Sequence, residues 1–279
     1  MYTLFGKNTD QKEFEIISKK LFQFNYIKNY PITFGKTKIN NDVGWGCAIR
    51  SFQMMLSYIL QKNNINKNKI LSLLYKYDGK LSLPIFIKEL NKRGYKEGTY
   101  LGGFLISNIY INLLLKVSID LFVTENNIID IDKLYFNKFT ILTFSVRLGI
   151  NNIGNYKNII LNCFNCKYFG GFIGGVGSSS YYFYAKDINN NLYYIDPHNI
   201  MDYDNNIKDI NKFLVKKYFS INIKKINPSI TFCFYYSNYY EFIELKKFLE
   251  KYTLFNILNI KDNKKYSCSN SSKEWEIIV

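Results

Sequence analysis

Histidine and long apolar runs are scarce in this chain of 279 residues. Its single histidine is His198, so a general base that titrates near neutral pH is either this side chain or a strongly perturbed group. The most apolar stretch, residues 102–123, is interrupted by Asn, Lys and Asp, so we expect core and not a membrane span. Five cysteines, an odd number, and a start without a basic and then apolar segment predict a reduced, cytoplasmic protein with no signal peptide.

Acidic residues are in the minority, and the formal net charge is +15 with an isoelectric point near 9.3. A basic chain suggests nucleic acid or an anionic membrane as a partner. The lysines, however, are scattered among a general excess of Asn, Ile, Lys and Tyr, which is typical of a coding bias, so we expect no nucleic-acid partner. The remaining hypothesis is transient contact with a negatively charged membrane, to which each well-placed Lys contributes about 1 kcal/mol.

The pattern of apolar residues predicts one compact α+β domain. Helical spacing predicts helices over residues 11–27, 47–60, 68–77, 83–94, 107–117 and 239–252. Runs of β-branched and aromatic residues predict strands over 138–149 and 230–237, and a hairpin over 179–200 with the turn KDINNN. The tail, residues 261–279, is polar and expected to be mobile.

The stretch DVGWGCAIRSFQMML, residues 42–56, places Cys47 directly before a predicted amphipathic helix. At the first turn of a helix, free backbone N–H groups and the positive end of the helix dipole stabilise a thiolate. The position therefore suits a nucleophile. The alternative is that Cys47 is a small apolar residue that begins a core helix.

His198 lies in YYIDPHNI, two positions after Asp196. On an extended strand these side chains project to the same face, so the carboxylate can orient the imidazole and favour its protonated form. Pro197 between them removes a backbone donor and indicates a strand end beside a cleft. For His198 alone the alternative is a structural histidine, and sequence spacing does not establish that it meets Cys47.

The segment around Cys47 closely resembles the active-site segment of the autophagin cysteine proteases, in which D-x-GWGC-x-x-R-x-x-QM is characteristic. Further matches follow in that family's order: YTLFGK, FNYIKNYP, VRLGINNI, GGVGSSSYYFYA and LYYIDPH. They span nearly the whole chain. The resemblance implies a papain-like cysteine protease domain over residues 1–260, with residues 63–120 as a small helical auxiliary lobe, and a monomer that needs no cofactor and no metal.

The resemblance also implies roles for single residues. Cys47 would attack the carbonyl after the C-terminal glycine of a ubiquitin-like autophagy modifier, His198 would transfer the proton, and Asp196 would orient His198. Tyr26 would donate a hydrogen bond from its hydroxyl to the oxyanion, together with the backbone N–H of Cys47, and each donor would stabilise the charge by about 3 kcal/mol. The alternative is that Tyr26 is one more buried aromatic residue. Trp45 would shape a slot that admits only glycine. Such enzymes mature the modifier precursor and release the modifier from phosphatidylethanolamine.

In the autophagin family a mobile glycine-rich loop covers the empty cleft and lifts when substrate arrives. The corresponding residues here are Gly174, Gly175, Val176, Gly177 and Ser178. Phe104 takes the place of a tryptophan on which that loop rests. Val176 and Gly177 replace the usual Lys-Pro pair, so the strength of this lid stays open.

Two short motifs remain. Cys163 and Cys166 form one C-x-x-C, and without a second pair or a nearby histidine we expect no zinc; two ordinary cysteines are favoured over a redox switch. In the tail, Trp275 and Ile278 have the aromatic-x-x-aliphatic spacing of a peptide that adds a strand to a partner's sheet edge. That pattern resembles the motif by which autophagy proteins dock the same modifier.

The sequence thus predicts a cysteine endopeptidase with a Cys-His-Asp triad. Two alternatives stay open: a papain-like protease for another ubiquitin-like protein, and a non-catalytic adaptor that binds the modifier.

Overall fold

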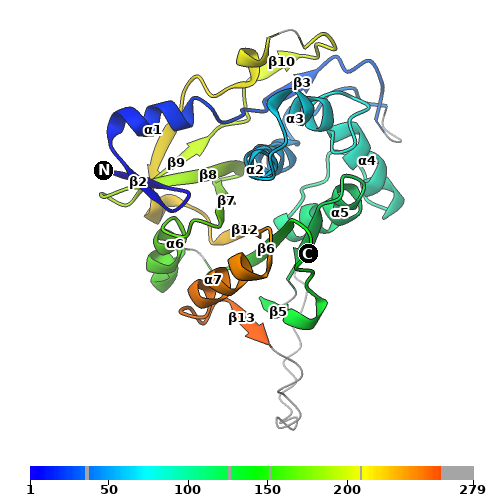
Figure 1. Cartoon of the computed structure of the whole chain (residues 1–279). Helices are drawn as coiled ribbons and strands as arrows, with labels where there is room; N and C mark the ends of the chain where they lie inside the picture. Colours follow the sequence, from blue (N-terminus) through cyan, green and yellow to red (C-terminus); the bar gives the residue numbers. More distant parts are fainter. Residues whose placement is uncertain (35–37, 125–126, 151, 208, 259–279) are drawn as a thin grey trace.

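A mainly antiparallel sheet runs through the molecule (Figure 1). The computed structural model describes residues 1–258 apart from 35–37, 125–126, 151 and 208. Within that part of the chain, nine strands form the sheet, with the central order β11-β9-β8-β7-β12-β6-β4 and with β1 and β2 joined at β8. They are β1 (Tyr2–Leu4), β2 (Lys7–Thr9), β4 (Asp120–Val123), β6 (Thr140–Arg147), β7 (Phe169–Val176), β8 (Ser179–Asp187), β9 (Asn191–Ile195), β11 (Phe219–Asn222) and β12 (Ser229–Tyr236). Only β4 and β6 pair in parallel within this described sheet.

Helices cover both faces of the sheet (Figure 1). One side carries α1 (Gln11–Ser18), α2 (Cys47–Lys62), α3 (Lys67–Leu74), α4 (Leu83–Lys92) and α5 (Gly103–Leu115), and the other carries α6 (Lys157–Cys163) and α7 (Tyr239–Leu249). Neighbouring residues of a strand alternate between two apolar cores. On β6, Ile141 packs with the α2 side and Leu142 with the α7 side, and Cys233 and Phe234 on β12 divide in the same way. Both faces are buried, which explains why these strands are continuous apolar runs.

Short elements complete the fold. β3 (Tyr26–Lys28) pairs in parallel with β10 (Ile200–Asp202), and β5 (Ile128–Asp130) pairs in parallel with β13 (Asn256–Leu258). The 3₁₀ helices are η1 (Ile131–Lys133), η2 (Gly154–Tyr156), η3 (Ile210–Phe213) and η4 (Ile223–Lys225). The β3–β10 pair matters most here, because it ties the segment before Cys47 to the segment that carries His198.

The central helix α2 lies close against the sheet. A side chain on Gly170 of β7 would place its Cβ 3.0 Å from Cδ1 of Ile59, so the missing side chain is what permits this approach. The helices of the predicted auxiliary lobe, α3, α4 and α5, share one apolar core with α2. Among the described residues, no helix has the length and apolar character that a membrane crossing needs.

Most predicted elements are confirmed: α2 to α5, α7, β6, β12 and the β8–β9 hairpin lie where the sequence patterns place them. The helix predicted over residues 11–27 is wrong in length, since it ends at Ser18. The following residues instead pair with a distant segment: Gln23 donates its N–H to the carbonyl of Phe213 at 2.7 Å, and Val215 donates to Leu21 at 3.0 Å. Tertiary pairing outweighs local periodicity there. The predicted tail, with Trp275 and Ile278, lies outside the described residues.

Candidate active site

Cys47 is the first residue of α2 and is 9% exposed. A tight turn delivers the chain to it: the N–H of Gly46 donates to the carbonyl of Asp42 at 2.9 Å, and Gly44 has a positive φ of 84°. Position 46 has no space for a side chain, because a Cβ there would lie 2.5 Å from Oδ2 of Asp42. The two glycines of GWGC therefore serve the backbone path that places the thiol at the helix start.

A buried ion pair holds this turn against the helix. Nε of Arg50 lies 2.6 Å from Oδ2 of Asp42, and both side chains are fully buried. The same guanidinium donates to the hydroxyl of Tyr30 at 2.6 Å and to Oε1 of Gln53 at 3.0 Å. The other oxygen of Asp42 accepts the N–H of Ile27 in β3 at 2.6 Å. The roles of Asp42 and Arg50 were not predicted from the sequence, although a charged residue at a core-facing position of a helix is a signal for such a pair.

His198 and Asp196 meet after the end of β9. Nδ1 of His198 lies 2.6 Å from Oδ1 of Asp196, and the backbone N–H of His198 donates to the same oxygen at 2.9 Å. The carbonyl of Pro197 accepts the N–H of Tyr26 at 2.9 Å, where β10 begins to pair with β3. Since Nδ1 is engaged by the carboxylate, Nε2 is the nitrogen left to face Cys47.

Two aromatic rings flank the imidazole. The ring of Tyr26 lies edge-on at 5.4 Å between centroids, and the ring of Tyr181 in β8 lies at 5.2 Å. Tyr181 in turn packs against Tyr194 of β9 at 4.7 Å. The rings restrict the orientation of His198 and limit the access of water to its pair with Asp196. Sequence reasoning missed Tyr181, which nothing distinguishes among 25 tyrosines.

The electrostatics favour a thiolate and an imidazolium. Burial would raise the pKa of Cys47, but hydrogen bonds from His198, from the backbone N–H of Ser180 and from Tyr26 outweigh it and lower that pKa below its usual value. The hydrogen bond to Asp196, followed by the one to Cys47, raises the pKa of His198 to about 9. The hydrogen bonds from His198 likewise lower the pKa of Asp196 in spite of its partial burial. Both shifts therefore favour the charged forms, the thiolate of Cys47 and the imidazolium of His198.

The other described cysteines have the opposite character. Burial raises the pKa of Cys163 and Cys233 far above the usual value, and it raises the pKa of Cys166 to about 11. A buried thiol that keeps its proton is a poor nucleophile and a poor redox sensor. The contrast singles out Cys47 as the reactive cysteine of the described part of the chain.

Tyr26 is placed to act on the same sulfur. It is 5% exposed, and its hydroxyl donates a hydrogen bond to Cys47. Burial, followed by the charge of Cys47, raises the pKa of Tyr26 far above neutrality, so the phenol remains a neutral donor. Such a donor next to the nucleophile is suited to an oxyanion that forms there. The N–H of Ser180 points at the same place and was not predicted from the sequence.

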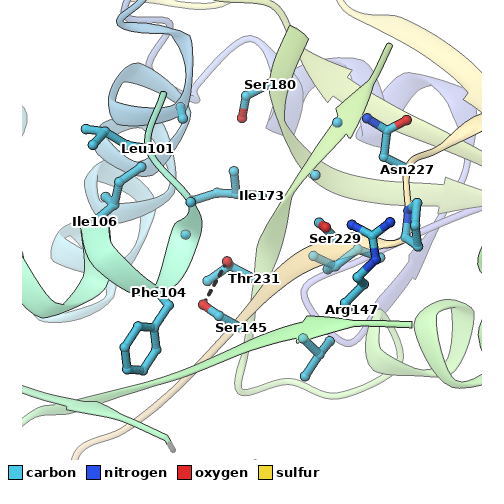
Figure 2. A pocket seen from close by; sticks show the side chains of 18 of the residues that line it. Leu101, Phe104, Ile106, Ser145, Arg147, Ile173, Ser180, Asn227, Ser229 and Thr231 are labelled. Atoms are coloured by element: carbon cyan, nitrogen blue, oxygen red, sulfur yellow. Dashed lines mark hydrogen bonds between the residues drawn. The ribbon is translucent and has the colours of Figure 1, made fainter. Parts of the chain in front are cut away.

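A cleft of about 630 Å³ lies between the start of α5 and strands β6, β7 and β12 (Figure 2). It borders Ala48, the residue after Cys47, and Ser180. Its walls are residues 100–104 and 106 at the start of α5, residues 145–147 of β6, residues 173–175 of β7 and residues 227–231 leading into β12, with Ile150 at the edge. Gly103 lets α5 approach β12, because a Cβ there would lie 1.7 Å from Oγ1 of Thr231. Arg147 is the one charged residue among those described as lining the cleft.

The residues predicted to form a mobile loop lie at the end of the β7–β8 hairpin. Val176 of β7 pairs with Ser179 of β8, which leaves Gly177 and Ser178 as a two-residue turn, and Gly177 has a φ of 60°. The side chain of Asn227 donates to the carbonyl of Gly177 at 2.7 Å. The pairing of β7 with β8 is regular from Phe172 to the turn, whereas Gly171 has a φ of 90° where the register of β7 with β12 shifts.

Some of the predicted substrate-binding residues line the cleft and others lie outside it. Gly174, Gly175 and Phe104 line the cleft, and Phe104 is 44% exposed. Val176, Gly177 and Ser178 lie at the hairpin end beyond it, and the half-buried Trp45 is next to the catalytic turn but not among the lining residues. Closure of the hairpin over the cleft and a glycine slot at Trp45 stay predictions.

A cysteine at the first position of a helix, hydrogen-bonded to a histidine that a carboxylate orients, beside a sheet and next to a cleft, defines a papain-like cysteine peptidase of the α+β class. The profile of the peptidase C54 catalytic domain matches residues 11–97 and 85–248. The chain belongs to the peptidase C54 family.

Similar proteins agree with this family. The chain is 27% identical to the cysteine protease ATG4 of Candida albicans over 252 residues, which are 83% of this chain and 56% of that protein. It is 30% identical to the probable cysteine protease atg4 of Schizosaccharomyces pombe over 175 residues (59% and 54%), and 24% identical to the cysteine protease ATG4B of Xenopus laevis over 222 residues (63% and 57%). The chain spans about half the length of the curated relatives it matches.

Proposed function

We propose that this protein is a cysteine endopeptidase that cleaves after the C-terminal glycine of a ubiquitin-like autophagy modifier. It would mature the modifier precursor and also release the modifier from phosphatidylethanolamine, acting in the cytoplasm with transient contact to the membrane that carries the lipid form. The observation that carries the proposal is the Cys47–His198–Asp196 arrangement with the Tyr26 hydroxyl, at the end of a cleft that is partly lined by glycine.

The geometry supports a reaction in two stages. The Cys47 thiolate attacks the carbonyl carbon of the glycine, and the oxygen takes the negative charge beside the Tyr26 hydroxyl and the backbone N–H of Cys47. Nε2 of His198 gives its proton to the leaving amine as the C–N bond breaks, which leaves a thioester on Cys47. The now neutral imidazole takes a proton from water, the water attacks the thioester, and the glycine carboxylate leaves as the thiolate returns.

One site can serve two leaving groups. The backbone amine of a precursor extension and the amine of phosphatidylethanolamine are attached to the same acyl group, so the attack, the oxyanion and the thioester are identical in both reactions. The apolar and glycine-lined walls of the cleft suit an extended chain of small residues on the acyl side. Backbone approach from both walls favours a substrate without a bulky side chain at the cleaved bond.

The test uses purified protein and a modifier precursor that carries extra residues after its C-terminal glycine, with Cys47→Ala as the matched control. Intact mass spectrometry should show loss of the extension with the wild type and no product with Cys47→Ala. Cleavage at another bond, or the same cleavage by Cys47→Ala, would refute the proposed reaction. A folded wild type that cleaves other ubiquitin-like precursors but not this one would refute the substrate and keep the peptidase.

A further inference from the structure

A second cavity, of about 560 Å³, lies between α3, the segment that follows it and the end of α5. Its lining residues are Ile65, Lys69, Ser72, Leu73, Lys76, Asp78, Gly79, Lys80, Lys116, Val117 and Ser118. None of them lines the catalytic cleft. The volume is in the range of cavities that hold small ligands.

Positive charge is concentrated in this cavity. Four of its eleven lining residues are Lys and one is Asp, whereas the catalytic cleft has one Arg among twenty and the whole chain has 37 Lys and Arg in 279 residues. A random sample of eleven residues of this chain would hold one or two cations, so scattered lysines do not account for the set. Together the lysines and Asp78 give the cavity a formal charge of +3 (four positive, one negative).

The described neighbours leave these lysines largely uncompensated. Within the described residues, no ion pair includes Lys69, Lys76 or Lys80. Nζ of Lys80 donates to the backbone carbonyl of Lys116 at 3.2 Å, and Nζ of Lys116 lies 3.8 Å from Oε1 of Glu89. Four lysines and one carboxylate beside a single cavity leave a net positive charge there, which a multivalent anion would neutralise.

The cavity is built on a rigid support. The N–H of Gly79 donates to the carbonyl of Lys76 at 2.9 Å, and the N–H of Leu81 donates to the carbonyl of Leu73 at 2.9 Å. Gly79 packs so tightly that a Cβ would lie 2.4 Å from the carbonyl oxygen of Ser72. The lysines thus extend from a fixed backbone, which reduces the ordering cost of binding.

We propose that this cavity binds a clustered phosphate anion, such as a polyphosphorylated inositol ring. The lysines would contact the phosphates, the hydroxyl of Ser118 would donate to them, and the apolar wall of Ile65, Leu73 and Val117 would face the ring carbons. Soluble inositol polyphosphates and phosphoinositide headgroups share this chemistry. The proposal rests on the cavity alone and does not depend on the proposed peptidase activity.

The test measures binding of inositol hexakisphosphate to the full chain by calorimetry at about 0.15 M salt. The triple variant Lys69→Ala, Lys76→Ala, Lys80→Ala should bind about 100-fold more weakly, because each well-placed lysine on a phosphate surface contributes about five-fold. The matched control replaces three exposed lysines outside the cavity, Lys12, Lys216 and Lys247, by Ala, with the same change in net charge, and should bind within about two-fold of the wild type.

Two further variants separate charge from folding. Asp78→Asn removes the only carboxylate among the described lining residues of the cavity and should tighten binding by about three-fold. Lys69→Arg with Lys80→Arg keeps the charge and should retain binding. The proposal is overturned if both triple variants lose the same affinity, if Asp78→Asn weakens binding, or if the wild type does not bind.

Vesicles distinguish the two sources of the phosphate group. Co-sedimentation is measured with two sets of phosphatidylcholine vesicles of equal total charge, one with a bisphosphorylated phosphoinositide and one with phosphatidylserine. A headgroup site is identified if only the phosphoinositide vesicles bind the protein and the cavity triple variant loses this binding. Binding of the soluble probe alone identifies a soluble inositol polyphosphate. Cleavage of a soluble modifier precursor should be unchanged in the cavity variant, so a failure of this proposal is distinguishable from a failure of the peptidase proposal.

Discussion

Arg50→Met tests whether the buried pair with Asp42 holds the catalytic turn. The substitution keeps an unbranched side chain but removes the charge and the hydrogen bonds to Asp42, Tyr30 and Gln53, and it leaves a fully buried carboxylate without its cation. Removal of one partner of a buried pair costs about 3–5 kcal/mol. A domain of this kind has a free energy of unfolding of about 5–15 kcal/mol, so the loss is a large part of the total.

Urea unfolding followed by far-ultraviolet circular dichroism measures this loss. The matched control is Arg93→Met, because Arg93 is exposed and its guanidinium donates to the carbonyl of Asn108; its cost should stay within about 0.5 kcal/mol. The double variant Asp42→Asn, Arg50→Met removes the orphaned charge as well, and the amide oxygen introduced at position 42 can still accept the N–H of Ile27. Its cost should be clearly below the sum of the two single costs.

The reasoning is refuted if Arg50→Met costs no more than Arg93→Met, or if the costs of Asp42→Asn and Arg50→Met add. Either result would mean that the two side chains do not stabilise one another in the folded protein. The turn before Cys47 would then need another support.

Three further predictions concern catalysis on the modifier precursor. The rate constant kcat/KM should fall above about pH 9 as His198 loses its proton. Because Asp196 is the main cause of the raised pKa of His198, Asp196→Asn should move this fall to lower pH. A fall at the same pH in the variant would contradict the role given to Asp196. Tyr26→Phe should lower kcat about 100-fold with little change in KM when cleavage of the precursor by the folded variant is compared with cleavage by the wild type. An unchanged kcat would show that Tyr26 does not stabilise the oxyanion. Tyr181→Ala should lower kcat/KM about ten-fold by freeing the imidazole of His198, while Tyr181→Phe keeps the ring and should stay within about two-fold; equal losses would point to the hydroxyl instead.

The sequence predicts best what depends on local pattern. The helix from Cys47 follows from apolar spacing that coincides with a truly buried face, and the Asp196–His198 contact follows from the i, i+2 relation. The α1 boundary fails because residues 21–23 bond to residues 213–215, which local spacing does not reveal. Strand β7 was not predicted as such, since its glycines suggest a loop when the partners on β8 and β12 are unknown.

The candidate site also has residues that local sequence indicates and residues that only the tertiary structure reveals. The residue types at positions 47, 196 and 198 indicate their chemistry, because few other side chains in the chain could do it. The backbone N–H of Ser180 and the ring of Tyr181 act through position alone, and position comes from the β7–β8–β9 register. The basic cavity is likewise invisible along the chain, since Lys116 joins the other three lysines only through the packing of α5 against α3 and α4.

The structure also explains how Cys47, Tyr26 and His198 are held together. Asp42 links three parts of the site: its carboxylate binds Arg50 of α2 and the N–H of Ile27 of β3, and its carbonyl accepts from Gly46. β3 pairs with β10, next to His198, so the thiol, the phenol and the imidazole belong to one connected frame. Because that frame is buried and hydrogen-bonded, it holds the three groups in place and favours the charged forms of Cys47 and His198. Substrate selection must then depend on the cleft and its β7–β8 hairpin, which lie outside this frame.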